Sequence, residues 1–389
     1  MAATDYQAVP SVRGDEQAPR AGTVVMKFGG TSVGDTEKLK AVARRIVATH
    51  EEGNRVVAVL SAMGHMTDEL IELAHQVSPA PTPRELDMLV SVGERISCAL
   101  AAMAIHDLGH EAISLTGSQA GIVTDTAHTK AKIVEVRARR IHEALDAGQI
   151  VLVAGFQGVS TAFEVTTLGR GGSDATAVAL AAAALEANCV VYTDVSGVFS
   201  ADPRLIPGAR KLDVLSYEEM LEMASSGAGV MMARSIEIAR SHNVKLHVRS
   251  TFDDAEGTWI QEEDELLEKA LISGVVHQRE ETVYHVRGIA PAPLFGALAE
   301  AAVNVDTIVQ TGSDEIVFSA PPDDRSAVDR TLGTLGVDWN VREGLGKVSL
   351  VGAGMKSHPG VAAKAFATLA AAGIETALVI TTQPDPFAN

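Results

Sequence analysis

Residues 23–34 read TVVMKFGGTSVG and carry the strongest structural signal in the chain. We interpret them as an apolar strand that ends at Phe28 and continues through Gly29 and Gly30 into a helix. Because glycine has no side chain, such a turn can bring backbone amides close to an anion, and Lys27 adds a cation at the strand end. The alternative is a tight strand–helix turn with an exposed lysine.

A second segment, LGRGGSD at residues 168–174, has similar features, with Arg170 as its cation. Two anion-binding loops with one cation each predict one site for a nucleotide phosphate and an acidic co-substrate. The first loop is not a P-loop, because Asp35 stands where the Walker lysine belongs. No segment matches the GxGxxG dinucleotide fingerprint either, since Ser357 follows Gly352 and Gly354 where a glycine is needed.

Strand-like and helix-like patterns alternate over residues 23–252, which predicts an α/β domain. The expected strands cover residues 24–28, 55–60, 150–155, 189–194 and 244–250, and a helix covers residues 36–50. These strands are apolar on both faces. We therefore expect a mostly parallel sheet sandwiched by helices.

The remaining residues form a different pattern after an acidic stretch at 261–268. Strands are expected at residues 282–286, 303–306, 316–318, 347–352 and 376–380, and helices at 293–302 and 361–372. This is a weak internal repeat of βαβ small-ligand modules whose second unit is truncated. We expect a disordered leader at 1–22, a catalytic domain at 23–255 and a shortened regulatory region at 256–389.

Composition narrows the class of function. The 389 residues are 46% hydrophobic and carry a formal charge of −18, which argues against nucleic acid and anionic membrane surfaces as partners. We find no stretch of about twenty apolar residues and expect no membrane span. Cys98 and Cys189 lie in apolar segments, which predicts buried free thiols and a reducing, cytoplasmic location.

A series of short motifs resembles the aspartokinases, members of the amino-acid kinase family. The matching segments are residues 27–33, 61–63, 91–95, 116–121, 155–158, 167–174, 193–195 and 202–204. The resemblance covers residues 24 to about 375. It implies an amino-acid-kinase fold followed by ferredoxin-like ACT modules, and ATP-dependent phosphorylation of the aspartate side chain to 4-phospho-aspartate with Mg²⁺, for amino-acid biosynthesis.

The resemblance also implies roles for individual residues. Lys27 and Asp174 would be catalytic; Thr67, Glu94, Arg170 and Ser173 would bind the amino acid; Lys27, Gly29, Gly30, Ser32, Thr193, Asp194, Phe199 and Arg204 would bind the nucleotide. The residue chemistry agrees, because an arginine can hold a carboxylate with two hydrogen bonds and a glutamate can pair with an α-ammonium. Asp194 also ends a buried strand, where α/β sheets place functional groups. We assign no resident metal site.

Two departures from the family pattern concern catalysis and regulation. Family members carry a second lysine where this chain has Gly229, and Arg234 or a second Mg²⁺ could substitute for it. The effector loops at residues 289–293, 311–315 and 378–384 are shortened or replaced. We therefore expect weak or no feedback by lysine or threonine, and a homo-oligomer formed through the ACT-like region.

Two alternatives to an aspartate kinase remain open at this point. One is an amino-acid kinase that acts on a modified aspartate in specialised metabolism. The other is a catalytically impaired paralogue that binds nucleotide or pairs with an active partner; Gly229 favours this alternative. Lys27, Arg170, Asp174 and Asp194 are all present and favour an active enzyme.

Overall fold

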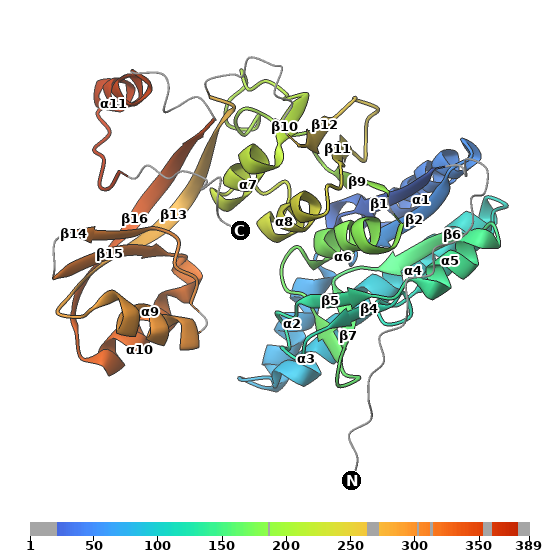
Figure 1. Ribbon diagram of the computed structural model, residues 1–389, viewed down its shortest axis with the longest axis horizontal. Coiled ribbons are helices and arrows are strands. Elements are labelled where there is room, and N and C mark those ends of the chain that lie inside the picture. The colour runs from blue at the N-terminus through green and yellow to red at the C-terminus, as the bar shows by residue number, and fades with distance from the viewer. Residues whose placement is uncertain are drawn as a thin grey trace, which may run out of the picture.

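The computed structural model describes residues 22–185, 187–262, 272–301, 303–311, 314–352 and 360–379. The expected leader, apart from Gly22, and the last ten residues lie outside this range. The chain forms two parts, and a long two-stranded ribbon connects them (Figure 1).

The first part is built on an eight-stranded sheet. Its spatial order is β10 (Val214–Ser216), β12 (Thr258–Gln261), β11 (Leu246–Ser250), β9 (Asn188–Thr193), β1 (Thr23–Phe28), β2 (Arg55–Leu60), β6 (Ile150–Ala154) and β3 (Ala112–Leu115). All neighbouring pairs are parallel except β11 with β12. The predicted mostly parallel sheet is confirmed, with β1 near its middle.

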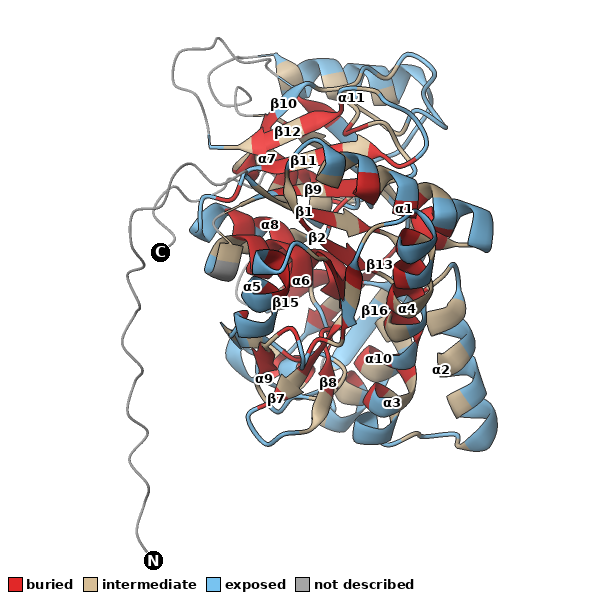
Figure 2. Cartoon of the chain, turned by 90° about the vertical axis from the view of Figure 1, so that its right-hand side faces the viewer, coloured by how far each residue is buried: buried red, intermediate tan, exposed pale blue. Residues whose placement is uncertain are grey.

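Helices cover both faces of this sheet. On one face lie α1 (Thr36–Glu51) and α4 (Val92–Asp107); on the other lie α5 (Arg139–Asp146), α6 (Gly172–Leu180), α7 (Tyr217–Ser225) and α8 (Ala233–Ser241). Alternate residues of β1 point to opposite faces, so that Val25 joins the second group and Met26 and Phe28 the first. Figure 2 shows the resulting buried centre, with α6 entirely within it.

A small second sheet adjoins the first part and has no counterpart in the sequence-based prediction. It consists of β5 (Ile133–Val136), β4 (Ile122–Thr124), β7 (Gln157–Ser160) and β8 (Val165–Thr167) in that order, beside α2 (Met66–Val77) and α3 (Pro83–Val90). Strand β8 leads directly into the glycine-rich loop at 168–172. The small sheet therefore supports the predicted substrate loop.

The second part is a four-stranded antiparallel sheet with helices on one face. The order is β14 (Ile308–Thr311), β15 (Glu315–Ala320), β13 (Gly274–Arg287) and β16 (Asp338–Val351), covered by α9 (Pro291–Glu300) and α10 (Arg325–Leu335); α11 (Val361–Ala371) follows. The rings of Tyr284 and Phe318 stack with their centroids 5.0 Å apart, and they share one hydrophobic cluster with Leu294 and Leu332. This arrangement is the expected ferredoxin-like module.

Strands β13 and β16 are longer than predicted and extend into the first part. Val276 and Val351 belong to the hydrophobic core of the large sheet. The Val275 amide donates to the Ser200 carbonyl at 2.8 Å, and β16 contacts α7. The ribbon therefore belongs to both parts of the molecule.

Short helical turns complete the secondary structure. They are the 3₁₀ turns Gly30–Val33 and Pro322–Asp324 and the π turn Ala181–Leu185. The helix predicted at residues 36–50 is confirmed as α1, and the 3₁₀ turn Gly30–Val33 lies between it and β1. Asp35 caps α1 by accepting a hydrogen bond from the Lys38 amide at 2.8 Å, which explains the break between the turn and the helix.

Three sequence predictions differ from the structure. Residues 303–306 are not a strand; the strand lies at Ile308–Thr311 instead. Residues 376–379 are also not a strand, and residue 380 lies outside the described range. Strand β12 lies beyond the expected boundary at residue 255 yet belongs to the large sheet.

The two cysteines are buried, and a long apolar helical segment is half-buried. Cys98 and Cys189 are free and buried, as predicted. By length and composition alone, Pro83–Asp107, in the described part of the chain, could cross a membrane, whereas the sequence led us to expect no span. Half of the most apolar 18 residues of this segment are buried, and α4 packs against α1 and the sheet. The apolar composition is therefore that of a core helix.

Candidate active site

Lys27 and Asp174 form an ion pair at the centre of the first part. The Lys27 Nζ lies 2.6 Å from the Asp174 Oδ1, and the two side chains are only 12% and 7% exposed. Lys27 lies on β1 and Asp174 in the first turn of α6, so the sheet and its most buried helix fix both groups. Because charges of this kind are costly to bury alone, each requires the other.

The loop after Lys27 packs closely around the ammonium group. A β-carbon at Gly29 would lie 3.4 Å from Lys27 Nζ, and one at Gly30 would lie 3.0 Å from the Ala62 carbonyl. Both glycines therefore allow close backbone packing around the lysine. Ser32 is different, since it is fully buried and its hydroxyl lies 2.6 Å from the Thr251 hydroxyl. It ties the loop to the end of β11.

The glycine-rich loop at 168–172 presents Arg170 to solvent. Gly171 has a φ of +68° and caps α6, and a β-carbon there would lie 1.7 Å from Met232 Cγ. No other residue fits this position without movement. Ser173 follows at the helix start and is 6% exposed, packed against Gly155. Arg170 thus extends from a rigid base.

Glu94 is a buried carboxylate with one oxygen unpartnered. The side chain is 2% exposed; its Oε1 accepts a hydrogen bond from the Ala62 amide at 3.2 Å, and its Oε2 has no partner within the described part of the chain. Burial raises the pKa of Glu94 to about 7. A perturbed, incompletely satisfied acid of this kind is typical of a ligand-binding site.

Asp87 is a buried group near this site that sequence reasoning missed. It accepts hydrogen bonds from the Thr167 hydroxyl at 2.5 Å and from the Thr129 amide at 3.1 Å, and its Oδ2 lies 2.7 Å from His128 Nδ1. The carboxylate therefore joins α3, β8 and the 125–130 loop. Since Thr167 precedes the Arg170 loop by one residue, Asp87 holds the base of that loop. An isolated aspartate in a helix pattern gave no signal of this role.

A large cleft lies at the carboxyl end of β9. Its volume is about 660 Å³. The lining residues come from three segments of the chain: the loop after β9 between residues 193 and 205, the end of α7 and the turn after it between residues 223 and 230, and the start of β13 between residues 275 and 279. This volume is ample for a nucleotide. Four residues predicted to bind nucleotide, Thr193, Asp194, Phe199 and Arg204, line it together.

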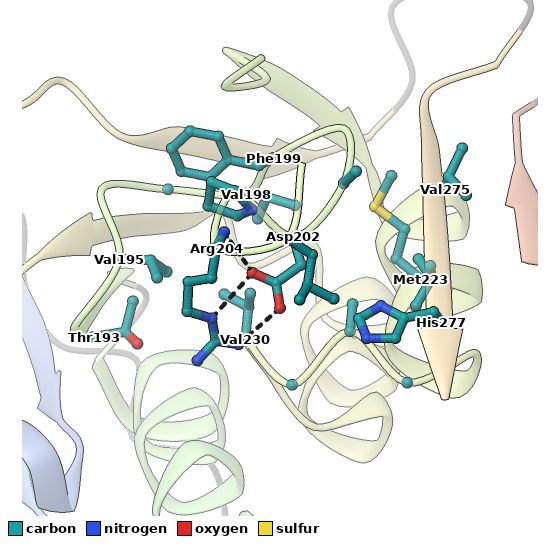
Figure 3. Close-up of a pocket in the computed structure, with 18 of the residues that line it drawn as sticks. Thr193, Val195, Val198, Phe199, Asp202, Arg204, Met223, Val230, Val275 and His277 are labelled. Carbon is teal, nitrogen blue, oxygen red and sulfur yellow. Dashed lines mark hydrogen bonds and ion pairs between the residues drawn. The ribbon is translucent and has the colours of Figure 1, made fainter. Parts of the chain in front are cut away.

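Within the cleft, Arg204 is already paired. Its guanidinium holds both oxygens of Asp202 at 3.0 Å, as the dashed lines in Figure 3 show. This pairing is the main reason why the pKa of Asp202 lies below its usual value, and His277 on the far side of the carboxylate adds to the effect. Asp194 is exposed and accepts a hydrogen bond from the Thr193 hydroxyl at 3.1 Å.

Thr67 and Arg234, two further residues singled out in the sequence, do not line the cleft. Thr67 is half-buried near the start of α2. Arg234, one possible substitute for the missing lysine, donates to the carbonyls of Leu168 and Ala131 at 3.2 and 3.1 Å. It therefore supports the Arg170 loop and is not among the residues that line the cleft.

Comparison with known proteins agrees with this geometry. Residues 22–250 match the model of the amino acid kinase family, and residues 348–383 match an ACT domain. The chain is 51% identical over 379 residues to an aspartokinase of Mycolicibacterium smegmatis, covering 92% of this chain and 90% of the relative. An aspartokinase of Geobacillus stearothermophilus is 47% identical over 368 residues, with the same coverage.

Solved structures show the same fold. The crystal structure of E. coli aspartokinase III in complex with aspartate and ADP matches with a TM-score of 0.77 at 25% identity, covering 89% of this chain and 91% of that one. The lysine and aspartate complex of the same enzyme matches with a TM-score of 0.66 at 26% identity, covering 84% and 86%. The chain therefore belongs to the aspartokinases, within the amino acid kinase family.

Proposed function

We propose that this protein transfers the γ-phosphoryl group of ATP to the side-chain carboxylate of aspartate. The observation that carries the proposal is Glu94, a buried carboxylate whose Oε2 is left without a partner in the described structure. An α-ammonium group would satisfy it. Arg170, which is exposed on its rigid loop, supplies a complementary donor for a carboxylate. Together they suit a small amino acid with an acidic side chain.

The chemistry needs little from the protein beyond charge and position. An ionised aspartate side-chain oxygen attacks the γ-phosphorus, the bond to the β–γ bridging oxygen breaks, and ADP leaves with that electron pair. No proton has to be removed, because the attacking carboxylate is ionised at neutral pH. Lys27 stabilises negative charge on the phosphate oxygens, while Asp174 holds the ammonium group in place. Ser173 and Thr67 complete the substrate pocket.

The cleft at β9 is the proposed nucleotide site, with Gly29 and Gly30 toward the phosphates. Asp194 has the chemistry that Mg²⁺ prefers, an exposed carboxylate facing the space where phosphates would lie. When bound, Mg²⁺ would neutralise part of the triphosphate charge. Ser32 acts through the loop backbone, because its hydroxyl is engaged by Thr251.

The direct test is to trap the product. An acyl phosphate reacts with hydroxylamine, so we expect a hydroxamate when the full-length protein is incubated with ATP, Mg²⁺ and aspartate. Analogues with a modified α-amino or α-carboxyl group should react poorly, since each loses a partner in the pocket. A modified aspartate that reacts better than aspartate would identify the specialised-substrate alternative instead.

A second candidate is a nucleotide-binding subunit without turnover. Position 229 favours it, because a β-carbon at Gly229 would meet no atom within 4 Å, so this wall of the cleft is open. Measurable ATP binding without hydroxamate from any aspartate analogue would support this candidate. Such a result would contradict the kinase proposal.

Regulation by lysine and threonine is expected to be weak or absent. The first shortened loop is short because α9 begins at Pro291, only four residues after β13 ends at Arg287. Part of the second loop and most of the third lie outside the described residues. We expect 5 mM lysine plus 5 mM threonine to change the initial rate by less than about twofold, since shortened loops remove the polar groups that recognise a free amino acid. Strong inhibition at these concentrations would show that the effector site is intact.

Assembly and location complete the proposal. We propose that the ACT-type region joins copies of the chain into a homo-oligomer, which light scattering of the purified protein tests directly. The two buried free thiols suit a reducing cytoplasm.

A further inference from the structure

Strand β13 brings two basic residues from the C-terminal part into the nucleotide cleft. His277 and Arg279 line the cleft together with Asp194, Phe199 and Arg204. They lie on the ribbon that connects the two parts, and not on a strand of the large sheet. Figure 3 shows His277 pointing into the cleft beside Asp202.

The ribbon packs directly against the turn that contains Gly229. Gly227 has a φ of +109°, and a β-carbon there would lie 2.6 Å from Gln278 Cγ and 3.2 Å from the His277 carbonyl. The 226–229 turn and residues 277–278 are therefore in close contact. Arg279 follows immediately on the strand and lines the same cleft as Gly229, where a β-carbon would meet no atom within 4 Å.

The strand pairing is irregular at Arg279. Gln278 is opposite Lys347 and Glu281 is opposite Leu345, so Arg279 and Glu280 together face the single residue Gly346. This is a β-bulge, a feature that redirects side chains and occurs often beside active sites. The bulge therefore gives Arg279 a direction that a regular strand would not.

The charge of the cleft shows what Arg279 contributes. Among the described lining residues, the carboxylates are Asp194 and Asp202, and Asp202 already neutralises Arg204. The Arg279 side chain is exposed and has no hydrogen-bond or ion-pair partner in the part of the chain that the structure describes. A nucleoside triphosphate carries up to four negative charges and needs an unpaired cation such as the Arg279 guanidinium.

We propose that Arg279 and His277 complete the ATP site from the ribbon by contacting the phosphate chain, and that Arg279 provides the positive charge that Gly229 does not. This inference rests on the proposed nucleotide site. It makes the regulatory part a contributor to nucleotide binding. ATP would then hold the ribbon against the 226–229 turn.

The test measures binding of Mg-ATP and of aspartate separately by calorimetry on the full-length protein. Arg279→Gln should raise the Kd for Mg-ATP about tenfold and leave the Kd for aspartate unchanged, the size expected for loss of one charged hydrogen bond. The loss should be smaller for AMP than for ATP, because AMP lacks the terminal phosphates. His277→Gln should weaken Mg-ATP binding about threefold.

Two controls separate this contact from general effects. Arg342→Gln removes the same charge from the partner strand β16 at an exposed position outside the cleft, and it should bind Mg-ATP normally. Glu280→Gln alters the other bulge residue and should also bind normally. If it weakens ATP binding as much as Arg279→Gln, the bulge and not the arginine is responsible, and the proposal is wrong.

A rescue variant gives the sharpest outcome. Gly229→Lys places an ammonium group in open space next to the ribbon, so the double variant Gly229→Lys/Arg279→Gln should recover Mg-ATP affinity to within about threefold of the parent. Equal ATP affinity of the parent and Arg279→Gln, or equal losses for ATP and AMP, would overturn the proposal. Because binding needs no turnover, these results are independent of the hydroxamate test. If Arg279→Gln does not fold, two other variants decide the question. Arg279→Lys keeps the charge and should bind Mg-ATP nearly as well as the parent, and the single variant Gly229→Lys adds a charge and should bind it more tightly.

Discussion

Replacing Lys27 by methionine is expected to lower kcat by about 10³-fold or more. Removal of one preorganised donor from a transition state costs about 10²–10³ in kcat, and Lys27 is a full charge held in a nearly dry position. The KM for aspartate should change little, because in the proposed site Glu94 and Arg170, and not Lys27, bind the amino acid. Hydroxamate formation under saturating ATP and aspartate measures the effect.

The same variant is expected to lose stability, which must be separated from catalysis. Without Lys27, Asp174 becomes a buried carboxylate without its partner, a change that costs about 3–5 kcal/mol in comparable cases. The double variant Lys27→Met/Asp174→Asn removes both charges and should recover most of the melting temperature but none of the activity. Lys40→Met, an exposed lysine on α1, is the matched control. Recovery of activity in the double variant would exclude the proposed role of Lys27.

Glu94→Gln is expected to stabilise the protein at pH 8 and to impair aspartate binding. In the folded protein burial raises the pKa of Glu94 to about 7, above its ordinary value of 4.5. The folded state therefore binds the proton more tightly than the unfolded state does. Folding stability falls as the pH rises from about 4.5 to 7, and the cost above pH 7 is on the order of 3 kcal/mol.

Glutamine avoids this cost but loses the negative charge. We expect the free energy of unfolding to rise by about 2 kcal/mol at pH 8 and by less than about 1 kcal/mol at pH 5. The kcat/KM for aspartate should fall by about 10²-fold or more, because an α-ammonium group would lose its charged partner. In the parent, the KM for aspartate should rise as the pH falls below 7, since protonated Glu94 cannot pair with a cation.

Denaturant unfolding at the two pH values and initial-rate kinetics measure these effects. Glu69→Gln, at an exposed position of α2, is the control and should change neither quantity. A Glu94→Gln variant with normal aspartate kinetics would show that the buried carboxylate is not part of the substrate site.

The elements that could be predicted from the sequence are those with local signals. Strand β1 and its glycine loop were recognisable because apolar periodicity, glycine and lysine occur within twelve residues. The Arg170 loop was recognisable for the same reason. The fold class followed from repeated strand and helix patterns, which depend on neighbouring residues alone.

The features that could not be predicted depend on distant partners. The β-bulge at Arg279 exists only because β16, about sixty residues later, pairs with β13 in a shifted register. Asp87 acquires its role from Thr167 and His128, which are 80 and 41 residues away. The length of β13 was missed because its exposed and polar positions interrupt the alternation that signals a strand.

The central position of β1 has a consequence for slow motions of the protein. Its backbone is paired with β2 along all six residues and with β9 along five, so its amides should exchange with deuterium only when the whole domain unfolds. The ends of the ribbon and α2, which has no buried residue, should exchange much earlier. Lys27 would then occupy the last segment to open, and heat or denaturant should disturb the periphery of the site long before the position of its lysine changes.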